Sequence, residues 1–359
     1  MSGAMPTLEV VIAVHDRRRP VGRAVASVLD GAPAGRVRVT VVVHNRPREE
    51  FDDLAARFRD APVRILDFSD DTRSPAGPFN FGVASATGDY VGLLGSDDRF
   101  EEGAVSAALA RIDRSRPDVL VYPLRHDGRP PLPNPLARRH RTERLDPIRD
   151  RLMYRTAPLA FVRRERFQQE AYRFTPGMPT GEDVETSARL WFTAPDIAFH
   201  PADPGYVVMD DGPERVTFAP RPVDVELAPF TRLLERDWVR ALPVRSRRAI
   251  VIKTMRVHAL GILFRRQSEG GWQEGDLAAF RRLCALADAT APRWRGPFAL
   301  ADAALLHTAE TASSTEQVDA AVRRRNAAGR LRRWVPANPL LIAHREAPLR
   351  RLVRYASWP

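Results

Sequence analysis

Short hydrophobic runs alternate with amphipathic segments over the first part of the chain. The runs Leu8–Val14, Val37–Val43 and Val63–Phe68 are almost continuously apolar and rich in β-branched residues, which is typical of strands buried on both faces. Between them, Val21–Leu29 and Glu49–Phe58 carry hydrophobic residues at helical spacing. The order strand, helix, strand, helix, strand predicts a parallel sheet with right-handed crossovers.

A fourth hydrophobic run follows Gly88 and ends at two adjacent carboxylates. Val91 and Leu93 predict a buried strand, and Asp97 and Asp98 come soon after it. Open α/β sheets bind their ligands at this end of the strands. The remaining patterns predict a short helix at Phe81–Ala86 after the Pro/Gly-rich stretch Ser74–Asn80, a helix at Ala104–Ile112, and a loop or mobile flap at His126–Pro147. They also predict strands at Asp118–Leu124 and Leu159–Val162, the latter followed by Arg163–Gln169, and strands at Ile197–Phe199 and Tyr206–Met209 that close the sheet.

Beyond residue 224 the chain shows helical spacing without any strand pattern. The sequence therefore predicts an α/β protein with two domains: a mostly parallel sheet flanked by helices at residues 1–224, and an all-helical C-terminal region at residues 225–359. The expected helical segments are Val225–Val239, Arg247–Arg265, Asp276–Ala289, Phe298–His307, Gln317–Arg333 and Pro348–Tyr355.

Charge is divided unevenly between these two parts. Residues 1–224 carry 32 basic and 33 acidic side chains, whereas residues 225–359 carry 24 and 12, so the whole excess of the +11 net charge lies in the helical part. Such a surface can hold nucleic acid, anionic lipid or a polyanionic substrate, and a solvated arginine-rich face is the alternative. We do not expect nucleic acid as a partner, because the basic region has no recognition motif.

Cysteine content and hydropathy indicate the cellular compartment in which the protein is expected. Cys284 is the only cysteine, so neither an internal disulfide nor a cysteine-rich metal site is expected. No window is apolar over the length that a membrane span requires, and no charged start followed by an apolar run opens the chain. These features predict a cytoplasmic protein.

Two acidic pairs are the candidates for chemistry. Asp97 and Asp98 offer adjacent hard oxygen ligands that suit Mg²⁺ or Mn²⁺, although a solvated turn or a helix N-cap would also use them. Glu182 and Asp183 follow a Gly/Pro-rich loop at residues 176–181 and start a predicted helix, where capping is the alternative. The sequence by itself leaves both alternatives open.

The ordered combination of these segments resembles the family 2 glycosyltransferases, over residues 7–220. The stretches that carry the resemblance read VVIAVHDRR, VVVHN, RSPAGPFNFGVASATGDYVGLLGSDD, TAPLAFVRRERF and GEDVETSARL. The resemblance implies a nucleotide-sugar-binding domain of the GT-A type. It also implies that Asp97 and Asp98 hold a divalent cation on the sugar diphosphate, that Asp183 is the catalytic base, and that Glu182 orients the loop or binds the acceptor.

The same resemblance implies where the nucleotide binds. The first strand is expected to contact the base through its backbone, and later loops the uracil, ribose and phosphates. The residues are Ala13, Val14, His15, Asp16, Asn45, Arg73, Asn80, Ser96 and Asp97. For Arg73, a surface arginine without contact to the phosphates is the alternative.

Three positions depart from the family pattern. The second strand ends in His44-Asn45 where the family usually has Asp, and Gly95 stands where Asp is frequent. A histidine common after the last strand has no counterpart; either Asp211 replaces it as a metal ligand or Asp211 lies in a solvated turn.

Together these features predict an inverting hexosyl- or N-acetylhexosaminyltransferase that uses a UDP-sugar and Mg²⁺ or Mn²⁺. The expected acceptor is a cell-surface glycan or anionic polymer, since the layout is similar to the glycosyltransferases that decorate wall teichoic acid. The basic helices are candidates for contact with the inner face of the membrane and for a homo-oligomer contact. The competing hypothesis is a non-catalytic polyanion-binding protein on a degenerate transferase fold.

Overall fold

The chain folds into two compact units, here called the sheet unit and the helical unit. The computed structural model describes residues 5, 7–210, 221–269 and 271–358. The described residues of the sheet unit are 5, 7–146 and 155–210, and those of the helical unit are 147–154, 221–269 and 271–358. The short segment 147–154 thus belongs to the helical unit although it is surrounded in sequence by the sheet unit.

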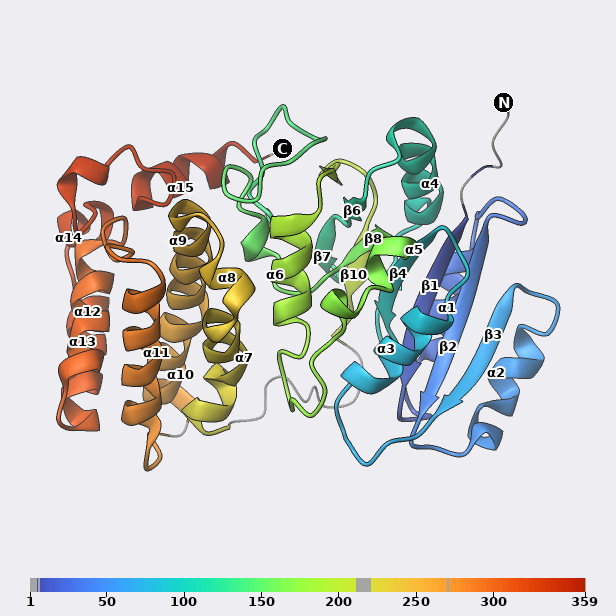
Figure 1. The fold of residues 1–359 in the computed structure, drawn as a ribbon, viewed down its shortest axis with the longest axis horizontal. Helices are drawn as coiled ribbons and strands as arrows, with labels where there is room; N and C mark the ends of the chain where they lie inside the picture. Colours follow the sequence, from blue (N-terminus) through green and yellow to red (C-terminus); the bar gives the residue numbers. More distant parts are fainter. Residues whose placement is uncertain (1–4, 6, 211–220, 270, 359) are drawn as a thin grey trace. The chain divides into compact units, whose positions relative to one another are not determined.

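A seven-stranded sheet forms the centre of the sheet unit (Figure 1). Its order is β3-β2-β1-β4-β8-β6-β9, and the strands are parallel except that β8 is antiparallel to both of its neighbours. The predicted parallel sheet is therefore confirmed. The strands are β1 (Leu8–Val14), β2 (Val37–His44), β3 (Val63–Phe68), β4 (Tyr90–Gly95), β6 (Val119–Val121), β8 (Ala160–Arg163) and β9 (Ile197–Phe199).

A second sheet of three short strands corrects two of the predictions. It consists of β5 (Arg99–Phe100), β10 (Tyr206–Val208) and β7 (Leu124–His126), in that order. The predicted single strand Asp118–Leu124 is divided between β6 and β7, since Pro123 has no N–H to continue a ladder. Tyr206–Met209 does not close the main sheet, because β10 pairs with β7 and β5 and so belongs to the small one.

Helices cover both faces of the main sheet. Val10 and Ile12 of β1 share a core with α1 and α4, while the alternate residue Val11 faces α3, where only Gly82 leaves room for the valine side chain. This unit contains α1 (Val21–Leu29), α2 (Asp52–Arg57) after the 3₁₀ turn η1 (Arg48–Phe51), α3 (Ala76–Ser85), α4 (Ala104–Ser115), α5 (Arg164–Phe167), η3 (Glu170–Tyr172) and α6 (Val184–Thr193).

The start of α3 differs from the sequence prediction. The sequence predicts a helix from Phe81, after the Pro/Gly-rich stretch Ser74–Asn80, yet the helix already begins at Ala76. Pro78 lies in the first turn, where backbone N–H groups lack an intrahelical partner anyway, so proline is tolerated there. The prediction was wrong because composition cannot distinguish a proline in a first helical turn from one in a loop.

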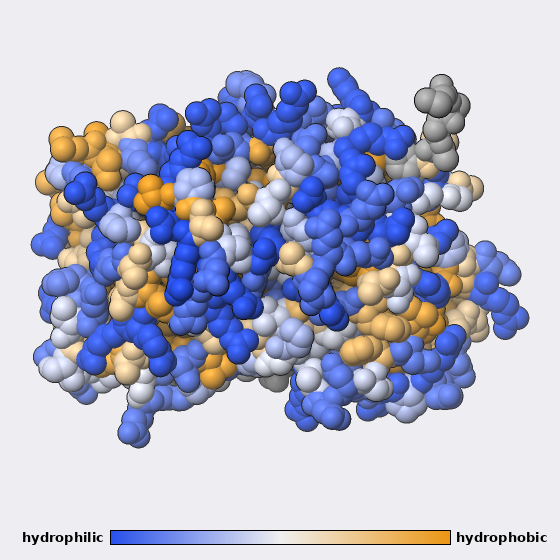
Figure 2. Space-filling model, viewed as in Figure 1, coloured by the Kyte–Doolittle hydropathy of each residue, from blue (hydrophilic) through white to orange (hydrophobic). Residues whose placement is uncertain are grey.

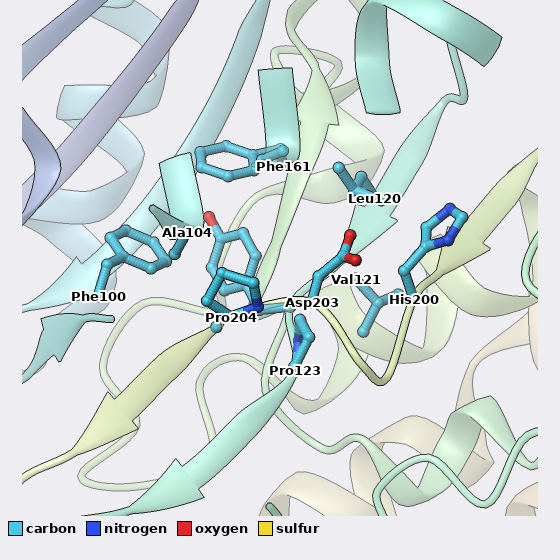
Figure 3. Close-up of a pocket in the computed structure, with 12 residues that line it drawn as sticks. Phe100, Ala104, Leu120, Val121, Pro123, Phe161, His200, Asp203 and Pro204 are labelled. Atoms are coloured by element: carbon cyan, nitrogen blue, oxygen red, sulfur yellow. The ribbon is translucent and has the colours of Figure 1, made fainter. Parts of the chain in front are cut away.

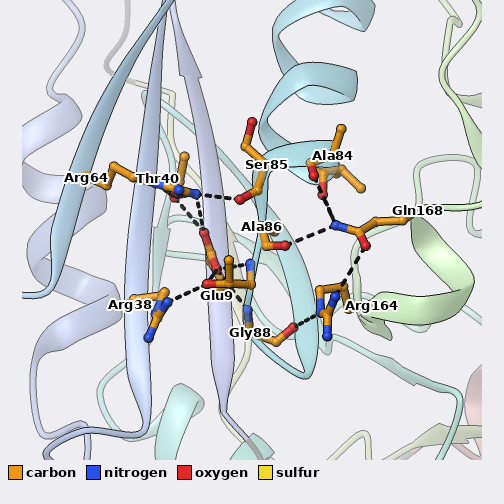
Figure 4. Close-up of polar contacts among 12 residues, drawn as sticks. Glu9, Arg38, Thr40, Arg64, Ala84, Ser85, Ala86, Gly88, Arg164 and Gln168 are labelled. Atoms are coloured by element: carbon orange, nitrogen blue, oxygen red, sulfur yellow. Dashed lines mark hydrogen bonds and ion pairs between the residues drawn. The ribbon is translucent and has the colours of Figure 1, made fainter.

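A buried carboxylate joins the first three strands near their amino ends (Figure 4). Glu9 is fully buried and accepts hydrogen bonds from the Thr40 hydroxyl at 2.6 Å and the Arg64 guanidinium at 3.0 Å. Its other oxygen accepts from the backbone N–H groups of Thr87 and Gly88 at 2.7 and 3.0 Å. Burial alone would raise the pKa of Glu9, but these hydrogen bonds and Arg64 hold that pKa below its usual value.

Within its described residues the helical unit contains helices and one isolated antiparallel bridge, between Ala299 and Pro336, but no strand. The helices are η2 (Leu152–Tyr154), α7 (Val223–Glu235), α8 (Asp237–Arg240), α9 (Val244–Lys253), the π-helix η5 (Thr254–Ala259), α10 (Leu260–Glu269), α11 (Asp276–Thr290), α12 (Leu300–Thr311), α13 (Thr315–Asn326), α14 (Arg330–Trp334), η6 (Pro339–Leu341) and α15 (Pro348–Ala356). Over the described parts of the chain, none of the helices has the length and apolar character needed to span a bilayer.

The π-helix changes which side chains are buried. Ile250, Met255 and Leu263 lie in the core, as their spacing predicts. Val257 follows Ile250 by seven residues in the predicted helical segment Arg247–Arg265, which at 3.6 residues per turn puts both on one face, yet 42% of its surface is exposed. The π-turn of η5 changes the helical period locally, so a stripe extrapolated at 3.6 residues per turn places Val257 on the wrong face.

Candidate active site

Three strand ends meet at one edge of the main sheet and bring the predicted site residues together. Ala13, near the end of β1, pairs with Val42 of β2 on one side and with Gly95 of β4 on the other. The loops that follow these strands, which carry His15, Asn45 and Asp97, therefore start side by side. The parallel order β2-β1-β4 places this edge at the carboxyl ends, as an open α/β sheet requires for a ligand site.

Asp97 is buried and paired with an arginine from the loop after β1. Its carboxylate lies 2.7 Å from the Arg19 guanidinium, and the two side chains are 10% and 12% exposed. Arg23 of α1 donates to the Asp97 carbonyl. The Nε–H of Arg19 is buried and has no hydrogen-bond partner among the residues that the structure describes. A buried unsatisfied donor beside Asp97 suits an anionic ligand such as a phosphate.

Asp98 is held by the small sheet. One carboxylate oxygen accepts the Tyr206 hydroxyl at 2.5 Å, and the other accepts the Met209 N–H at 2.9 Å. Tyr206 in turn accepts from the Gly95 N–H at 3.1 Å. Burial first, and the Asp98 charge second, raise the pKa of Tyr206 well above its usual value, so Tyr206 stays protonated and donates to Asp98.

Aromatic rings support Tyr206 from behind. Phe100 meets Tyr206 edge-on with ring centroids 5.8 Å apart, and Tyr122 stacks on it at 6.2 Å. Next to this cluster lies a pocket of about 330 Å³, shown in Figure 3, whose lining includes Phe100, Tyr122 and Phe161 but neither Asp97 nor Asp98. The pocket lining is thus mainly apolar and does not include the Asp97-Asp98 pair.

The Asp97-Asp98 pair has the donor chemistry for Mg²⁺ or Mn²⁺. A Cβ atom at Gly95 would lie 2.7 Å from Asp98 Oδ2 and 3.2 Å from Asp97 Oδ1, so both carboxylates converge beside this glycine. Within the described residues no group of three or more His, Cys, Asp or Glu side chains is arranged to hold a metal ion. Asp211, the third predicted ligand, lies outside the described residues. Two carboxylates with water and substrate phosphates form a usual Mg²⁺ site.

The end of β2 is braced by a carboxylate that sequence reasoning missed. Asp70, two residues after β3, accepts from His44 Nε2 at 2.8 Å and from the Thr72 N–H at 3.1 Å. Asn45 uses both halves of its amide in the same loop, accepting from the Asp70 N–H at 2.8 Å and donating to the Thr72 carbonyl at 2.9 Å. The side chain of Asn45 therefore holds the loop, and Asp70 supplies the carboxylate that the second strand lacks. Its position directly after a predicted strand was the available signal.

The other predicted nucleotide contacts differ in how they are used. Asn80 of α3 holds the backbone of Phe174 from both sides, at 2.8 and 3.0 Å. Arg18 holds the pKa of Asp16 below its usual range through a 2.6 Å ion pair, while burial first and the Arg19 charge second lower the pKa of His15. Of the other four, Ala13 is half-buried, Val14 and Ser96 are buried, and Arg73 is exposed in the loop before α3.

Glu182 and Asp183 stand at the start of α6, as predicted. The loop before them turns through Gly177 and Gly181, both at φ +71°, a conformation that favours glycine. Asp183 occupies the N-cap position but makes no side-chain capping hydrogen bond, so the capping alternative does not explain its carboxylate. The Thr175 N–H donates to the Glu182 carbonyl at 2.9 Å, and burial raises the pKa of the Glu182 carboxyl.

Residues 9–170 match the family model described as Glycosyl transferase family 2. This segment therefore resembles a family 2 glycosyltransferase domain. It contains the Asp97-Asp98 pair, while Glu182 and Asp183 lie just beyond it. The chain is also similar to the succinoglycan biosynthesis protein ExoO of Rhizobium meliloti (strain 1021), with 27% identity over 117 residues, which cover 33% of each chain.

Solved structures match over most of the chain. S. aureus TarS 1-349 in complex with UDP-GlcNAc has a TM-score of 0.72 at 17% identity, covering 89% of this chain and 92% of that one. The longer S. aureus TarS gives 0.69 at 14% identity, and the match spans 55% of its length. At these identities the likeness shows the fold alone, which is the GT-A fold followed by a helical C-terminal region.

Proposed function

We propose that this family 2 glycosyltransferase transfers a hexose or N-acetylhexosamine from a UDP-sugar with inversion at the anomeric carbon. The observation that carries the proposal is the pair of carboxylates converging beside Gly95 at the end of β4, with Arg19 2.7 Å from Asp97. The fold shared with a UDP-GlcNAc complex of TarS supports a UDP-sugar as the donor.

In the proposed reaction, Asp183 acts on the acceptor, while Arg19, Asp97 and Asp98 act on the diphosphate of the donor. Asp183 takes the proton from the acceptor hydroxyl as its oxygen attacks C1, while the bond from C1 to the diphosphate breaks on the opposite face. Arg19 lies where its charge stabilises the departing diphosphate. Mg²⁺ or Mn²⁺ held by Asp97 and Asp98, with Asp211 as a candidate third ligand, would neutralise the same charge. A single displacement of this kind inverts the anomeric centre.

Nucleotide recognition in this proposal rests on the ends of the first three strands. In this proposal the backbone at Val14 and His15, at the carboxyl end of β1, contacts the base, and Asp70 beside His44 is a nearby carboxylate. Arg73, exposed in the loop before α3, remains a candidate phosphate contact. Burial raises the pKa of Glu182, and in this proposal Glu182 orients the loop or binds the acceptor while Asp183 is the base.

The proposed acceptor is an anionic, phosphate-bearing polymer. An open pocket of about 510 Å³ in the helical unit is lined by Arg151, Arg245, Arg248 and Arg345, against one acidic residue, Glu346. Arg245 lies in the first turn of α9, which contains no acidic residue, so a bound anion would complement this helix end. A polymer offers many repeats, so one repeat can be held here while another reacts in the sheet unit.

Glu346 offsets only part of the positive charge of this pocket, because four arginines line it against this one carboxylate. Its carboxylate lies 3.0 Å from Arg151, 3.1 Å from Arg351 and 3.5 Å from Arg256. Burial would raise the pKa of Glu346, but these arginines lower it to about 2. The carboxylate thus stays ionised within an excess of arginines, and the pocket keeps a net positive charge.

The test compares wild type with Asp183→Asn for UDP-sugar binding by thermal shift and for sugar transfer or UDP-sugar hydrolysis. We expect the Asp183→Asn variant to keep donor binding and lose about two to four orders of magnitude in rate, since an amide cannot accept the proton. Glu185→Gln, on the same helix and 3.3 Å from Arg189, is the matched control and should retain the wild-type rate. Wild-type rates for Asp183→Asn would disprove the base assignment, and absence of any UDP-sugar binding by wild type would favour a non-catalytic polyanion-binding protein.

A further inference from the structure

The last helix, α15, is attached to the helical unit by its charged side. Arg351 lies 3.1 Å from Glu346, and its guanidinium stacks over the Tyr154 ring at 4.6 Å from the centroid. The Arg351 side chain is 13% exposed and that of Glu346 is 7% exposed. This buried ion pair fixes which side of α15 faces the protein.

The opposite side of α15 is apolar and faces solvent. Helical geometry places Leu349, Leu352 and Val353 away from Arg351, and their exposed fractions are 40%, 47% and 61%. An amphipathic helix of a globular protein normally turns its apolar stripe to the core. Here the stripe is turned outward, and an exposed apolar patch of this kind is characteristic of an interaction surface.

Other exposed hydrophobic residues gather in the same part of the sequence. Of the ten large hydrophobic side chains exposed within the described residues, seven lie between Leu331 and Tyr355. Figure 2 shows hydrophobic surface at the upper left, over α14 and around α15. We call this set the tail surface: Leu331, Leu340, Ile342, Leu349, Leu352, Val353 and Tyr355.

The charge around the tail surface is strongly positive. Residues 327–358 contain seven arginines and one acidic residue, the buried Glu346. Arg330, Arg332, Arg333 and Arg350 are exposed. Exposed aliphatic side chains bordered by arginines, with no exposed carboxylate in these residues, are complementary to an anionic lipid surface.

We propose that the tail surface docks on an anionic phospholipid bilayer, with α15 lying in the plane of the interface. Leu349, Leu352 and Val353 enter the acyl boundary, while Arg350 and the arginines of α14 contact the phosphate headgroups. A symmetric dimer through this surface is disfavoured, since it would bring two strongly basic surfaces against each other. The inference does not depend on the donor sugar or the acceptor.

The experiment measures co-sedimentation of the whole chain with vesicles of phosphatidylcholine alone or with added phosphatidylglycerol. We expect binding that requires phosphatidylglycerol and weakens as salt rises. Leu352→Ser with Val353→Ser should reduce the partition coefficient at least about tenfold, and Arg350→Ser should reduce it about fivefold. The matched control is Val244→Ser with Val257→Ser, two comparably exposed residues outside the tail surface, which should bind like wild type.

Thermal unfolding of each variant shows whether it remains folded, and UDP-sugar hydrolysis without vesicles should be unchanged by Leu352→Ser with Val353→Ser. The proposal is overturned if folded wild type ignores phosphatidylglycerol, or if both double variants lose binding equally. It is also overturned if wild type forms a dimer that Leu352→Ser with Val353→Ser dissociates, because a second copy then covers the tail surface.

Discussion

Gly95 stands where Asp is frequent in the family, and the structure gives a steric reason for the glycine. A side chain there would collide with Asp98, which Tyr206 and the Met209 N–H hold in place. In this chain a glycine therefore keeps the two carboxylates together. The change at the end of β2 is accompanied in a similar way by Asp70, which pairs with His44 at 2.8 Å.

The metal proposal makes a prediction at the same residues. Asp98→Asn should weaken Mn²⁺-stimulated UDP-sugar binding by about 100-fold or more, because removing even an outer-shell partner of a metal ligand costs about 10- to 100-fold. Calorimetric titration of UDP with and without Mn²⁺ measures this effect. Tyr206→Phe is the comparison: it removes the 2.5 Å hydrogen bond to Asp98 but keeps the carboxylate, so it should cost less, about 10-fold. Equal Mn²⁺ stimulation in wild type and Asp98→Asn would refute the assignment.

Individual residues of the candidate site could be predicted only where they belong to a recognisable motif. Asp97, Asp98 and Asp183 stand at strand and helix ends that hydrophobic periodicity locates. Arg19 was not predicted, because three consecutive arginines follow Asp16 and periodicity does not show which one turns towards Asp97. The bracing role of Asn45 was also hidden, since its partners come from the loop after β3.

At the scale of elements, prediction succeeded where one local pattern sufficed. Continuous β-branched runs gave β1, β2 and β3 within a residue or so, and their parallel order followed from the alternation with helices. Prediction failed where tertiary pairing decides, as in the assignment of β7 and β10 to a separate sheet. It also failed where a helix changes its period, as at η5.

The Glu9 network predicts a pH-dependent contribution of the first strands to stability. Glu9→Gln should lower the free energy of unfolding at pH 7 by about 2 kcal/mol, because an amide cannot accept from Thr40, Arg64 and two backbone N–H groups at once. The folded pKa of Glu9 is below its usual 4.5, so this stabilisation is complete above that value and is lost as pH falls through the folded pKa.

Urea denaturation followed by circular dichroism at pH 7 and at acidic pH measures the difference between wild type and Glu9→Gln. The control is Glu50→Gln, which removes a surface pair with Arg46 and should cost less than about 1 kcal/mol. A difference for Glu9→Gln that stays constant from about pH 7 to about pH 3 would show that the charge of Glu9 contributes nothing.

Net charge differs between the two parts of the whole molecule. The part that carries the proposed chemistry, residues 1–224, is balanced within one charge, whereas residues 225–359 hold twice as many basic as acidic side chains. Some of these arginines are used internally, as in the Arg325–Asp302 pair at 2.7 Å and the cluster around Glu346. Others line the 510 Å³ pocket of the helical unit or border the tail surface. Composition alone therefore overstates the positive charge that is available to a ligand, and it does not show where that charge lies.

The acceptor proposal predicts that polymer affinity depends on salt and on one group of arginines. Arg245→Ser with Arg248→Ser, in the pocket, should weaken the apparent affinity for a phosphate-bearing polymer about five- to tenfold. Arg323→Ser with Arg324→Ser removes the same charge from the exposed surface of α13 and should have a smaller effect.

The wild-type affinity should fall as salt shortens the Debye length from about 10 Å at 0.1 M to about 3 Å at 1 M. Initial rates at varied polymer concentration across a salt series measure all three chains. If both pairs of substitutions act equally, the polymer senses only the net charge, and if affinity is independent of salt, the acceptor is not recognised through its phosphates.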